Sequence, residues 1–519
     1  MSKIFSRQIW LSDWMIIGYF AAVKLALHLA AISEFGYFRD ELYYIACTQH
    51  LDFGFVDLPP LSILLLKTVR FFLGDSLFAI RILPALGGVL FIFLTGLIAR
   101  ELGGKKYALA LASAAALATT GNFAIFHTYS MNFLDMIFWQ ICILLVIKII
   151  KTENPKYWLA FGLTAGIGLQ NKISVLFLCF GIAAGVILTK QRKQLKSPYL
   201  WMGLVLALVL FLPYIIWNLT HGWPTLEFMH NARAYKMADV SPLGFLLGQI
   251  LFNNPATIIV WLAGLWYFFL HKDGKKYRLF GWMYISIYIL FTLQEAKDYY
   301  LAPAYPILFA GGAVIYEMMP KRKILTGIKA LSITALIIFT FITAPLTLPL
   351  LSPENTAEYT SAFGLGEDSS EKHEMGKLPQ HFADMFGWEE MTAVFAQAYN
   401  SLSPEEQTLC TVYVTNYGEA GAIDFFGRKY DLPKALCTHN SYWFWGPGNE
   451  NFNVVLTLGG SRDLDASRED LEQCFEQVEY AGTIRCKYCM PYENNLPVFI
   501  CKGFKGSEEE IWNAEKHFI

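Results

Sequence analysis

Residues 79–99 read AIRILPALGGVLFIFLTGLIA, an apolar run in which Arg81 is the only charged side chain. A helix that crosses the hydrocarbon core of a bilayer needs about 20 apolar residues. Comparable runs recur from about Leu11 to Leu351, separated by short charged or Gly/Pro-containing breaks. Of the 519 residues, 55% are hydrophobic and 16% are charged, whereas soluble domains carry about 25% charged residues. The composition therefore excludes an ordinary soluble protein and predicts a polytopic α-helical membrane protein.

We expect about eleven transmembrane helices, at residues 13–32, 79–99, 107–125, 132–150, 157–170, 173–189, 199–217, 245–270, 279–294, 300–319 and 324–348. Lys and Arg concentrate in alternate breaks between these spans, which the positive-inside rule places in the cytoplasm together with the N-terminus, Lys3 and Arg7. The agreement requires two short spans on either side of Gln170–Lys172, since one long helix would put the later basic clusters outside. The first span lacks a small-residue cleavage site and is interpreted as a retained signal anchor.

The chain divides near residue 350. Residues 1–350 form the expected transmembrane domain, and residues 351–519 form a soluble α/β or α+β domain on the opposite, periplasmic face. Strand-like segments are Thr411–Val414, Val454–Leu458 and Leu496–Cys501; helix-like segments are Glu389–Tyr399 and Arg468–Tyr480, the latter opened by Ser467. Residues 352–380 are polar and without periodicity, which indicates a linker.

Six of the nine cysteines lie in the C-terminal domain. In an oxidising compartment they could form disulfides. They could also be free thiols, or Cys486 and Cys489 could be half of a zinc site. The net charge of −2 and the absence of a basic stripe with interleaved aromatic residues argue against a nucleic-acid partner.

The segment Phe38-Arg39-Asp40-Glu41 directly follows the first span. Ionisable residues close to a bilayer core are costly and tend to be functional. A carboxylate can act as the base when a group is transferred to a hydroxyl or an amine. The structural alternative is that Asp40 and Glu41 suit the first turn of an interfacial helix.

A second acidic residue, Asp57, precedes Pro59 and Pro60, which end any helix and place Asp57 on the same outer face. A solvated loop carboxylate is the alternative. Asp135 lies at the outer end of the fourth span, where it needs a partner or water. It could be a second acid of a site or an interhelical strut to Arg81.

Two cations, Lys172 and Lys297, face the outer side against the positive-inside rule. They indicate an anionic ligand such as a phosphate at the membrane surface. Snorkelling of both side chains to lipid headgroups is the alternative. Tyr299 and Tyr300 follow Lys297 directly.

Together these residues make residues 35–320 resemble glycosyltransferase family 39, the GT-C membrane enzymes that include protein O-mannosyltransferases and bacterial aminoarabinose transferases. The motifs that carry the resemblance are Arg39-Asp40-Glu41, Asp57-x-Pro59-Pro60, Arg81, Asp135, Asn171-Lys172 and Lys297-x-Tyr299-Tyr300-Leu301-x-Pro303. Residues 221–228, 416–423 and 489–493 are similar to a bacterial branch of the family.

The resemblance implies a GT-C-like catalytic domain in a bacterial inner membrane, a polyprenyl-phosphate sugar donor, and inverting transfer on the periplasmic side. Asp40 would be the base, and Glu41 and Asp135 would shape the acceptor site. The lipid phosphate would be held by Lys172, Lys297 and Tyr299 or Tyr300. Further substrate-binding candidates are Asp57, Arg81 and Trp223.

Trp223 could stack on a sugar ring or belong to the interfacial aromatic belt. Acidic loop residues could hold a divalent metal, although the sequence requires no cofactor. The acceptor could be a lipid, a protein or a polysaccharide of the envelope. The chain departs from the aminoarabinose transferases at Tyr43, where an Arg is expected, and at Leu58, where a Lys is expected. These departures imply rearranged phosphate binding.

Two other functions fit a polytopic chain with intramembrane charges. A transporter or flippase for a lipid-linked or anionic substrate would show broken helices in two related halves, and the sequence has no such internal symmetry. An inactive scaffold whose C-terminal domain binds a partner is the other alternative.

Overall fold

The computed structural model describes residues 12–320, 322–364, 374–447 and 452–519, and it contains two compact units. The helical unit comprises Met1–Ser33, Phe78–Ile216 and Asp239–Leu350. The sheet unit comprises Glu34–Leu77, Trp217–Ala238 and Leu351–Ile519. The expected division at residue 350 is thus crossed by two segments that pack with the C-terminal part of the chain. The assignment of 1–350 as catalytic and of 351–519 as periplasmic stays a prediction.

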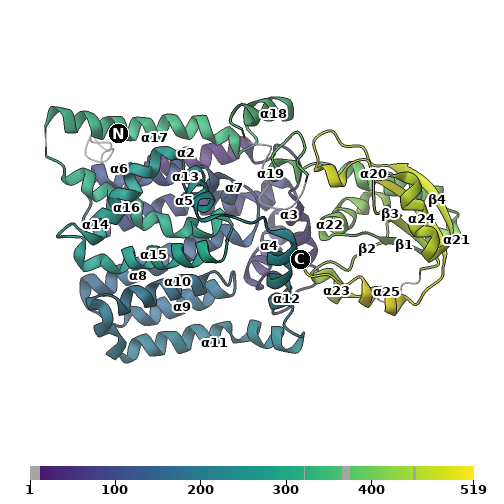
Figure 1. Cartoon of the computed structure of the whole chain (residues 1–519), viewed down its shortest axis with the longest axis horizontal. Coiled ribbons are helices and arrows are strands. Elements are labelled where there is room, and N and C mark those ends of the chain that lie inside the picture. The colour runs from purple at the N-terminus through teal and green to yellow at the C-terminus, as the bar shows by residue number, and fades with distance from the viewer. Residues whose placement is uncertain (1–11, 321, 365–373, 448–451) are drawn as a thin grey trace. The chain divides into compact units, whose positions relative to one another are not determined.

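Long apolar helices build the helical unit, and Figure 1 shows them running side by side. By length and composition, six helices among the described residues could cross a membrane. They are α2 (Asp13–Ala31), α5 (Leu77–Glu101), α8 (Met131–Thr152), α11 (Pro198–Thr220), η5 with α16 (Asp298–Met318) and α17 with η6 (Lys323–Leu346). The count rises to nine if each of three bent helix pairs is one span. Helices or bent pairs coincide with all the expected spans, which confirms the polytopic fold, but not all of them meet the length criterion for crossing. Lys3 and Arg7 lie outside the described residues.

Three spans are short or bent because polar residues interrupt them. α6 (Lys106–Ala118) and α7 (Gly121–His127) meet at 75°, and α10 (Val175–Ile187) meets η1 (Lys190–Lys196) at 109°. α13 (Pro242–Phe252) meets η3 (Pro255–Thr257) and α14 (Ile258–Phe269) at 91°. The expected straight spans 107–125 and 245–270 are therefore wrong as single helices. The remaining helices of this unit are α9 (Tyr157–Leu169) and α15 (Arg278–Leu293).

The 91° bend follows from Asn254 and Pro255. Pro255 has no N–H for the helix ladder, and Asn254 has a φ of +71°. The buried Asn254 side chain donates to the Ala118 carbonyl at 3.1 Å and accepts the Ala256 N–H at 3.0 Å. An apolar environment requires that freed backbone groups find such partners, so the asparagine makes the bend possible.

Glycine contacts hold α14 against α16 (Tyr305–Met318). A Cβ on Gly264 would lie 2.1 Å from the Leu308 carbonyl oxygen, and one on Gly312 would lie 1.9 Å from the Val260 carbonyl oxygen. The two backbones therefore touch, as small residues allow in membrane helix pairs. Gly162 and Gly203 bring α9 and α11 together in the same way.

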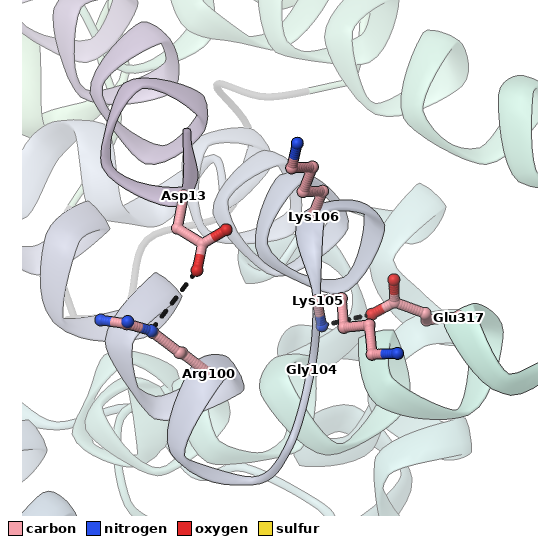
Figure 2. Close-up of a pocket in the computed structure, with 6 residues that line it drawn as sticks. All are labelled: Asp13, Arg100, Gly104, Lys105, Lys106 and Glu317. Carbon is pink, nitrogen blue, oxygen red and sulfur yellow. Dashed lines mark hydrogen bonds and ion pairs between the residues drawn. The ribbon is translucent and has the colours of Figure 1, made fainter. Parts of the chain in front are cut away.

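An ion-pair cluster at the ends of α2, α5 and α6 surrounds a cavity of about 480 Å³ (Figure 2). Asp13 pairs with Arg100 at 3.4 Å. The Glu317 carboxylate accepts the N–H groups of Lys105 and Ala108 at the start of α6, where a helix dipole favours negative charge. These contacts join one lining residue to another or to the start of α6, so the cluster has a structural role.

The sheet unit contains a five-stranded sheet in the order β2-β1-β3-β5-β4. The strands are β1 (Cys410–Tyr413), β2 (Ala435–Leu436), β3 (Val454–Leu458), β4 (Phe475–Thr483) and β5 (Pro497–Phe504). β2, β1 and β3 are parallel, and β5 is antiparallel to β3 and β4. Every residue of the central strand β3 is buried. The packed helices include α20 (Trp388–Ser401), α22 (Tyr417–Phe426), α23 (Ser441–Trp445), α24 (Leu464–Cys474) and α25 (Glu508–Ala514).

Two earlier segments complete this unit. Glu34–Leu77 contributes α3 (Arg39–Cys47) and α4 (Leu61–Leu73), and Trp217–Ala238 contributes α12 (Pro224–Asn231) and η2 (Ala232–Lys236). A Cβ on Gly421 of α22 would lie 2.8 Å from the Leu42 carbonyl carbon, so α22 packs backbone to backbone on α3.

The strands and the helix at 389–399 are confirmed, but the expected helix Arg468–Tyr480 is wrong. Its helical part is α24, capped by Asp463 rather than Ser467 and ending at Cys474. The rest is strand β4, because Val478 and Tyr480 pair with Cys501 and Phe499 of β5. Tertiary pairing overrides the local helical pattern here.

The expected linker 352–380 is also only partly correct. Ser352 caps helix α18 (Pro353–Ala362), and α19 (Gln380–Ala383) follows; residues 365–373 lie outside the described part of the chain. All nine cysteines are free thiols in the structure, including buried Cys486 and Cys489.

Replacing Gly264 by Ala should destabilise the protein, since the added methyl group would meet a backbone carbonyl that cannot rotate away. We expect a drop in Tm of about 1–3 °C, from overpacking of about 1–3 kcal/mol in a chain of this length. Tryptophan fluorescence during thermal unfolding in detergent measures it. Gly327→Ala is the matched control, because a Cβ there has nothing within 4 Å. Equal Tm values for both variants would contradict the close helix contact.

Candidate functional site

Helix α3 begins with the acidic pair. The Glu41 carboxylate accepts the Phe38 N–H at 2.9 Å and is fully buried, so it caps its own helix. Asp40 is one residue earlier on the helix, and 36% of its side chain is exposed. The structural interpretation therefore fits Glu41, while Asp40 is open to solvent and ligands.

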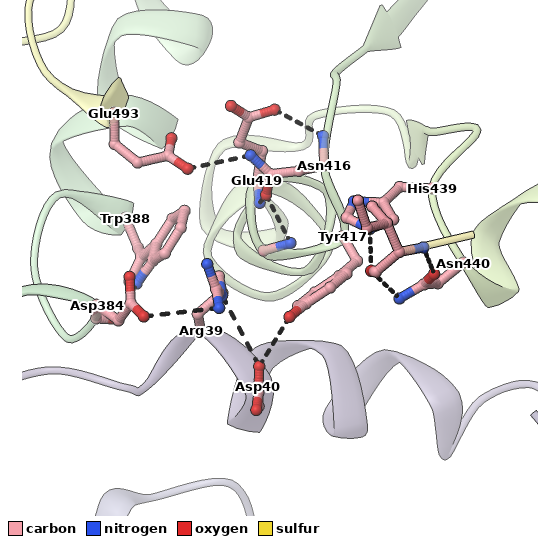
Figure 3. Close-up of polar contacts among 12 residues, drawn as sticks. Arg39, Asp40, Asp384, Trp388, Asn416, Tyr417, Glu419, His439, Asn440 and Glu493 are labelled. Atoms are coloured by element: carbon pink, nitrogen blue, oxygen red, sulfur yellow. Dashed lines mark hydrogen bonds and ion pairs between the residues drawn. The ribbon is translucent and has the colours of Figure 1, made fainter. Parts of the chain in front are cut away.

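One oxygen of Asp40 is oriented by the sheet unit. Tyr417, the first residue of α22, donates its hydroxyl to Asp40 Oδ1 at 3.0 Å, and Arg39 Nε lies 3.8 Å from the same oxygen (Figure 3). The Arg39 guanidinium also donates to the Tyr492 hydroxyl at 3.0 Å and pairs with Asp384 at 3.7 Å. Arg39 thus ties the start of α3 to three segments of the C-terminal part of the chain.

A buried pair of acids lies behind Arg39. Glu419 accepts two backbone N–H groups, from Thr415 and Asn416. The Asn416 side chain donates to Glu493 at 3.0 Å (Figure 3). Burial raises the pKa of both glutamates, and the charge of Glu419 raises the pKa of Glu493 further. Both shifts favour the protonated form, which reduces the repulsion between two carboxyl groups that share one site.

Asp57 is held by the residue that departs from the family pattern. Tyr43 donates its hydroxyl to Asp57 Oδ1 at 2.9 Å, and the Tyr43 oxygen lies 2.7 Å from Ser441 Oγ. Burial raises the pKa of Asp57 to about 7; the Tyr43 hydrogen bond opposes the rise and the charge of Asp40 adds to it. A tyrosine hydrogen bond thus holds Asp57, which is not a freely solvated loop residue.

Trp223 stands at the N-cap of α12 with a φ of +61°, and 42% of it is exposed. Pro224 follows at the first helical position. This geometry presents the indole at a helix start, and it is compatible with both interpretations of Trp223.

In the helical unit, four of the expected site residues come together. Lys172 lies in the turn between α9 and α10, and its ammonium donates to Asn132 Oδ1 at 2.6 Å. Asp135 Oδ2 is 4.0 Å away, and the ring centres of Tyr299 and Tyr300 are both at 5.3 Å. These residues come from α8, the turn and η5 (Asp298–Ala304), so the fold converges on one cation.

The other two candidates of this unit occupy separate positions. Ser174 donates to Asp135 at 2.5 Å, while the fully buried Arg81 contacts the Ile32 carbonyl and His127, each at 3.5 Å. Lys297 precedes η5 directly, next to the tyrosine pair. The partners of Asp135 are thus Lys172 and Ser174 rather than the expected Arg81, and its role as a site acid stays a prediction.

Among the residues that the structure describes, no three or more His, Cys, Asp or Glu side chains are grouped so that they could hold a metal ion. Cys486 and Cys489 are accordingly not part of such a group. Within the described ranges, the divalent-metal site that the acidic loop residues could supply therefore finds no support in their arrangement.

Sequence reasoning missed the role of Tyr417. Its signal was present, since Asn416 and Glu419 have the spacing of a capping box, and both backbone contacts of that box form. Gly418 and Gly421 lie three residues apart, and a Cβ on Gly418 would lie 2.5 Å from Arg39 Cγ. A helix that begins with a capping box and carries two glycines on one face, as α22 does, is expected to pack closely on another element.

Known proteins support the GT-C resemblance. A family model described as dolichyl-phosphate-mannose-protein mannosyltransferase matches residues 57–217. Lipid A galacturonosyltransferase RgtD of Rhizobium johnstonii is 22% identical over 270 residues, which is 51% of this chain and 56% of that protein. This chain thus aligns with only about half the length of that relative.

Two crystal structures of ArnT from Cupriavidus metallidurans share the fold. The one bound to undecaprenyl phosphate has a TM-score of 0.60 at 12% identity and covers 95% of this chain and 98% of its own. The apo structure has a TM-score of 0.61 at 12% identity, covering 93% and 97%. The chain is therefore a multi-pass membrane protein with the GT-C fold. This shared fold confirms the GT-C-like architecture that the resemblance implied.

Asp57 should make stability depend on pH. An unfolded Asp releases its proton near pH 3.9, whereas folded Asp57 holds it to about pH 7. Between these values the folded state binds the extra proton, so stability falls as the pH rises. In Asp57→Asn, the free energy of unfolding should fall by up to about 4 kcal/mol less over this pH range than in the wild type. Thermal melts between pH 4.5 and 8 measure the difference.

Asp470→Asn, on the exposed face of α24, is the matched control and should follow the wild-type profile. The buried pair Glu419 and Glu493 contributes equally to all three proteins. Parallel profiles for wild type and Asp57→Asn would contradict the assignment.

Proposed function

We propose that this chain is a membrane glycosyltransferase that moves a sugar from a polyprenyl-phosphate donor to an acceptor on the periplasmic side of a bacterial inner membrane. The names of its relatives support this class: two are glycosyl- or mannosyltransferases, and one ArnT structure holds undecaprenyl phosphate. The C-terminal part, in this proposal, faces the periplasm.

The observation that carries the proposal is the set of side chains around the Lys172 ammonium. One ammonium, at the end of two short membrane helices, is flanked by two tyrosine rings and fixed by Asn132. When the bond between the sugar and the lipid phosphate breaks, negative charge develops on a phosphate oxygen. A preorganised cation stabilises that charge as it forms. Asp135, at 4.0 Å, keeps Lys172 paired before the donor arrives.

Asp40 is the proposed base. It is partly exposed, and Tyr417 orients one of its oxygens, which leaves the other oxygen for an acceptor. The acceptor hydroxyl gives its proton to Asp40 while its oxygen bonds to the anomeric carbon, and the lipid phosphate leaves with the former bonding pair. Attack opposite the leaving group inverts the anomeric centre. Asp57 and Trp223 are proposed to contact substrate, and the acceptor is a lipid, protein or polysaccharide.

Replacing Asp40 by Asn should abolish most transfer, because it removes the base and retains the shape. We expect kcat to fall by about 10²–10⁴-fold. Sugar transfer from a radiolabelled polyprenyl-phosphate sugar by the purified chain in detergent measures it. Tyr417→Phe should lower kcat by about tenfold, from loss of one charge-assisted hydrogen bond, with little change in donor KM. Asp470→Asn is the control for the loss of an exposed carboxylate and should keep full activity. Full activity of Asp40→Asn would show that Asp40 is not the base.

Replacing Lys172 by Met should weaken both donor binding and leaving-group stabilisation. We expect kcat/KM for the donor to fall by about 10²-fold or more, as for loss of a preorganised transition-state contact. Lys272→Met is the control, because Lys272 is an exposed lysine of the loop between α14 and α15. If the wild type instead moves the lipid-linked sugar across liposome membranes without transferring it, the chain is a flippase.

A further inference from the structure

The sheet unit contains a cavity of about 300 Å³ that none of the preceding roles uses. Three distant segments line it. His50 and Asp52 come from the loop after α3, Trp217 lies at the end of α11 with His221 just after the helix, and Ser441 and Trp445 come from α23. Its volume is at the lower end of the roughly 300–1,000 Å³ range of small-ligand sites. One sugar-sized ring is therefore the scale of ligand to consider.

Flat aromatic surfaces dominate the lining. The His50 ring stacks on Trp445 with centroids 4.2 Å apart and planes at 10°. Trp217 stacks on His221 at 4.5 Å and 22°, and Phe444 meets His221 edge-on at 5.1 Å. The negative face of an aromatic ring attracts weakly positive hydrogen atoms. The C–H face of a pyranose ring presents such atoms in a flat array.

Asp52 supplies the polar edge. Its Oδ2 accepts the Trp217 indole N–H and its Oδ1 accepts the Phe53 N–H, each at 2.7 Å. These contacts fix the carboxylate, and each oxygen keeps a lone pair for a further donor. Two hydroxyl groups on neighbouring carbons of a sugar could both donate to it.

The lining disfavours other ligand classes. No Lys or Arg lines the cavity, and a carboxylate does, so it does not suit a phosphate. A hydrocarbon chain would desolvate the Asp52 carboxylate without replacing its hydrogen bonds. The His and Asp side chains of the lining are not grouped to hold a metal ion.

We infer that this cavity binds an uncharged pyranose ring, with Trp445 and Trp217 against its C–H face and Asp52 accepting from its hydroxyls. Ser441 connects the cavity to the candidate site, because its hydroxyl lies 2.7 Å from the Tyr43 oxygen, which itself donates to Asp57. Given the proposed function, on which this last step rests, the ring belongs to a saccharide acceptor.

Saturation-transfer NMR on the purified full-length chain in detergent tests binding directly. The probes are methyl β-glucopyranoside and methyl β-galactopyranoside. With the wild type we expect saturation to reach the ring protons of at least one of them. Asp52→Asn should weaken the Kd by about tenfold, as for a hydrogen bond to a charged group, and Trp445→Leu by about threefold to tenfold, as for an aromatic contact.

Trp201→Leu is the matched control, since Trp201 is an exposed tryptophan of α11 outside the cavity lining, and it should bind as the wild type does. Thermal melts of each variant check folding, and Asp52→Asn carries the test if Trp445→Leu is unstable. No saturation of either glycoside, or equal binding by Asp52→Asn and Trp201→Leu, would overturn the inference.

The two proposals fail separately. Glycoside binding that Asp52→Asn weakens, in a chain without any transfer activity, supports the saccharide site and removes the proposed function. Transfer with an acceptor KM that Asp52→Asn leaves unchanged supports the proposed function and overturns the acceptor assignment.

Discussion

The sheet unit depends on one buried guanidinium. Arg39 pairs with Asp384, donates to Tyr492 and lies over the ring of Tyr417, so residues from three parts of the C-terminal chain surround one side chain of α3. A buried charge is tolerated only when it is paired and hydrogen-bonded. Without these partners Arg39 could not stay in the interior, and α3 could not pack closely on α22. Tyr417, which lies under the Arg39 guanidinium, also donates to Asp40, so the packing around Arg39 orients Asp40 as well.

The helical unit obeys a related constraint. Polar groups in an apolar environment need partners from the protein, and the bends and turns of this unit are places where such partners gather. Asn254 satisfies backbone groups at the sharp bend between α13 and α14. Lys172, Asn132 and Asp135 satisfy one another in the turn between α9 and α10. The first arrangement joins backbone groups, whereas the second places a cation beside two aromatic rings, where the phosphate of the donor is proposed to bind.

Much of this could be predicted from the sequence, because hydrophobic length and local spacing are local properties. The apolar runs placed the membrane helices apart from the bends within 107–125 and 245–270, and the unusual cation Lys172 indicated a polar cluster that the structure forms with Tyr299 and Tyr300. Three results depend on contacts between distant residues and could not be derived. The bend at Asn254 needs the Ala118 carbonyl as partner, and strand β4 needs the edge of β5. The cavity lined by the stacked rings of His50 and Trp445 unites segments almost 400 residues apart.

The contact between Arg39 and Tyr492 spans 453 residues, and this separation has a consequence for biosynthesis. A ribosome adds about 5–20 residues per second, so α3 waits roughly 20–90 seconds after its own synthesis before Tyr492 exists. During that interval the Arg39 guanidinium lacks its partners Asp384 and Tyr492. Nascent chains that stop before α22 cannot orient Asp40, so any proton-accepting function of that carboxylate is delayed until translation is almost complete.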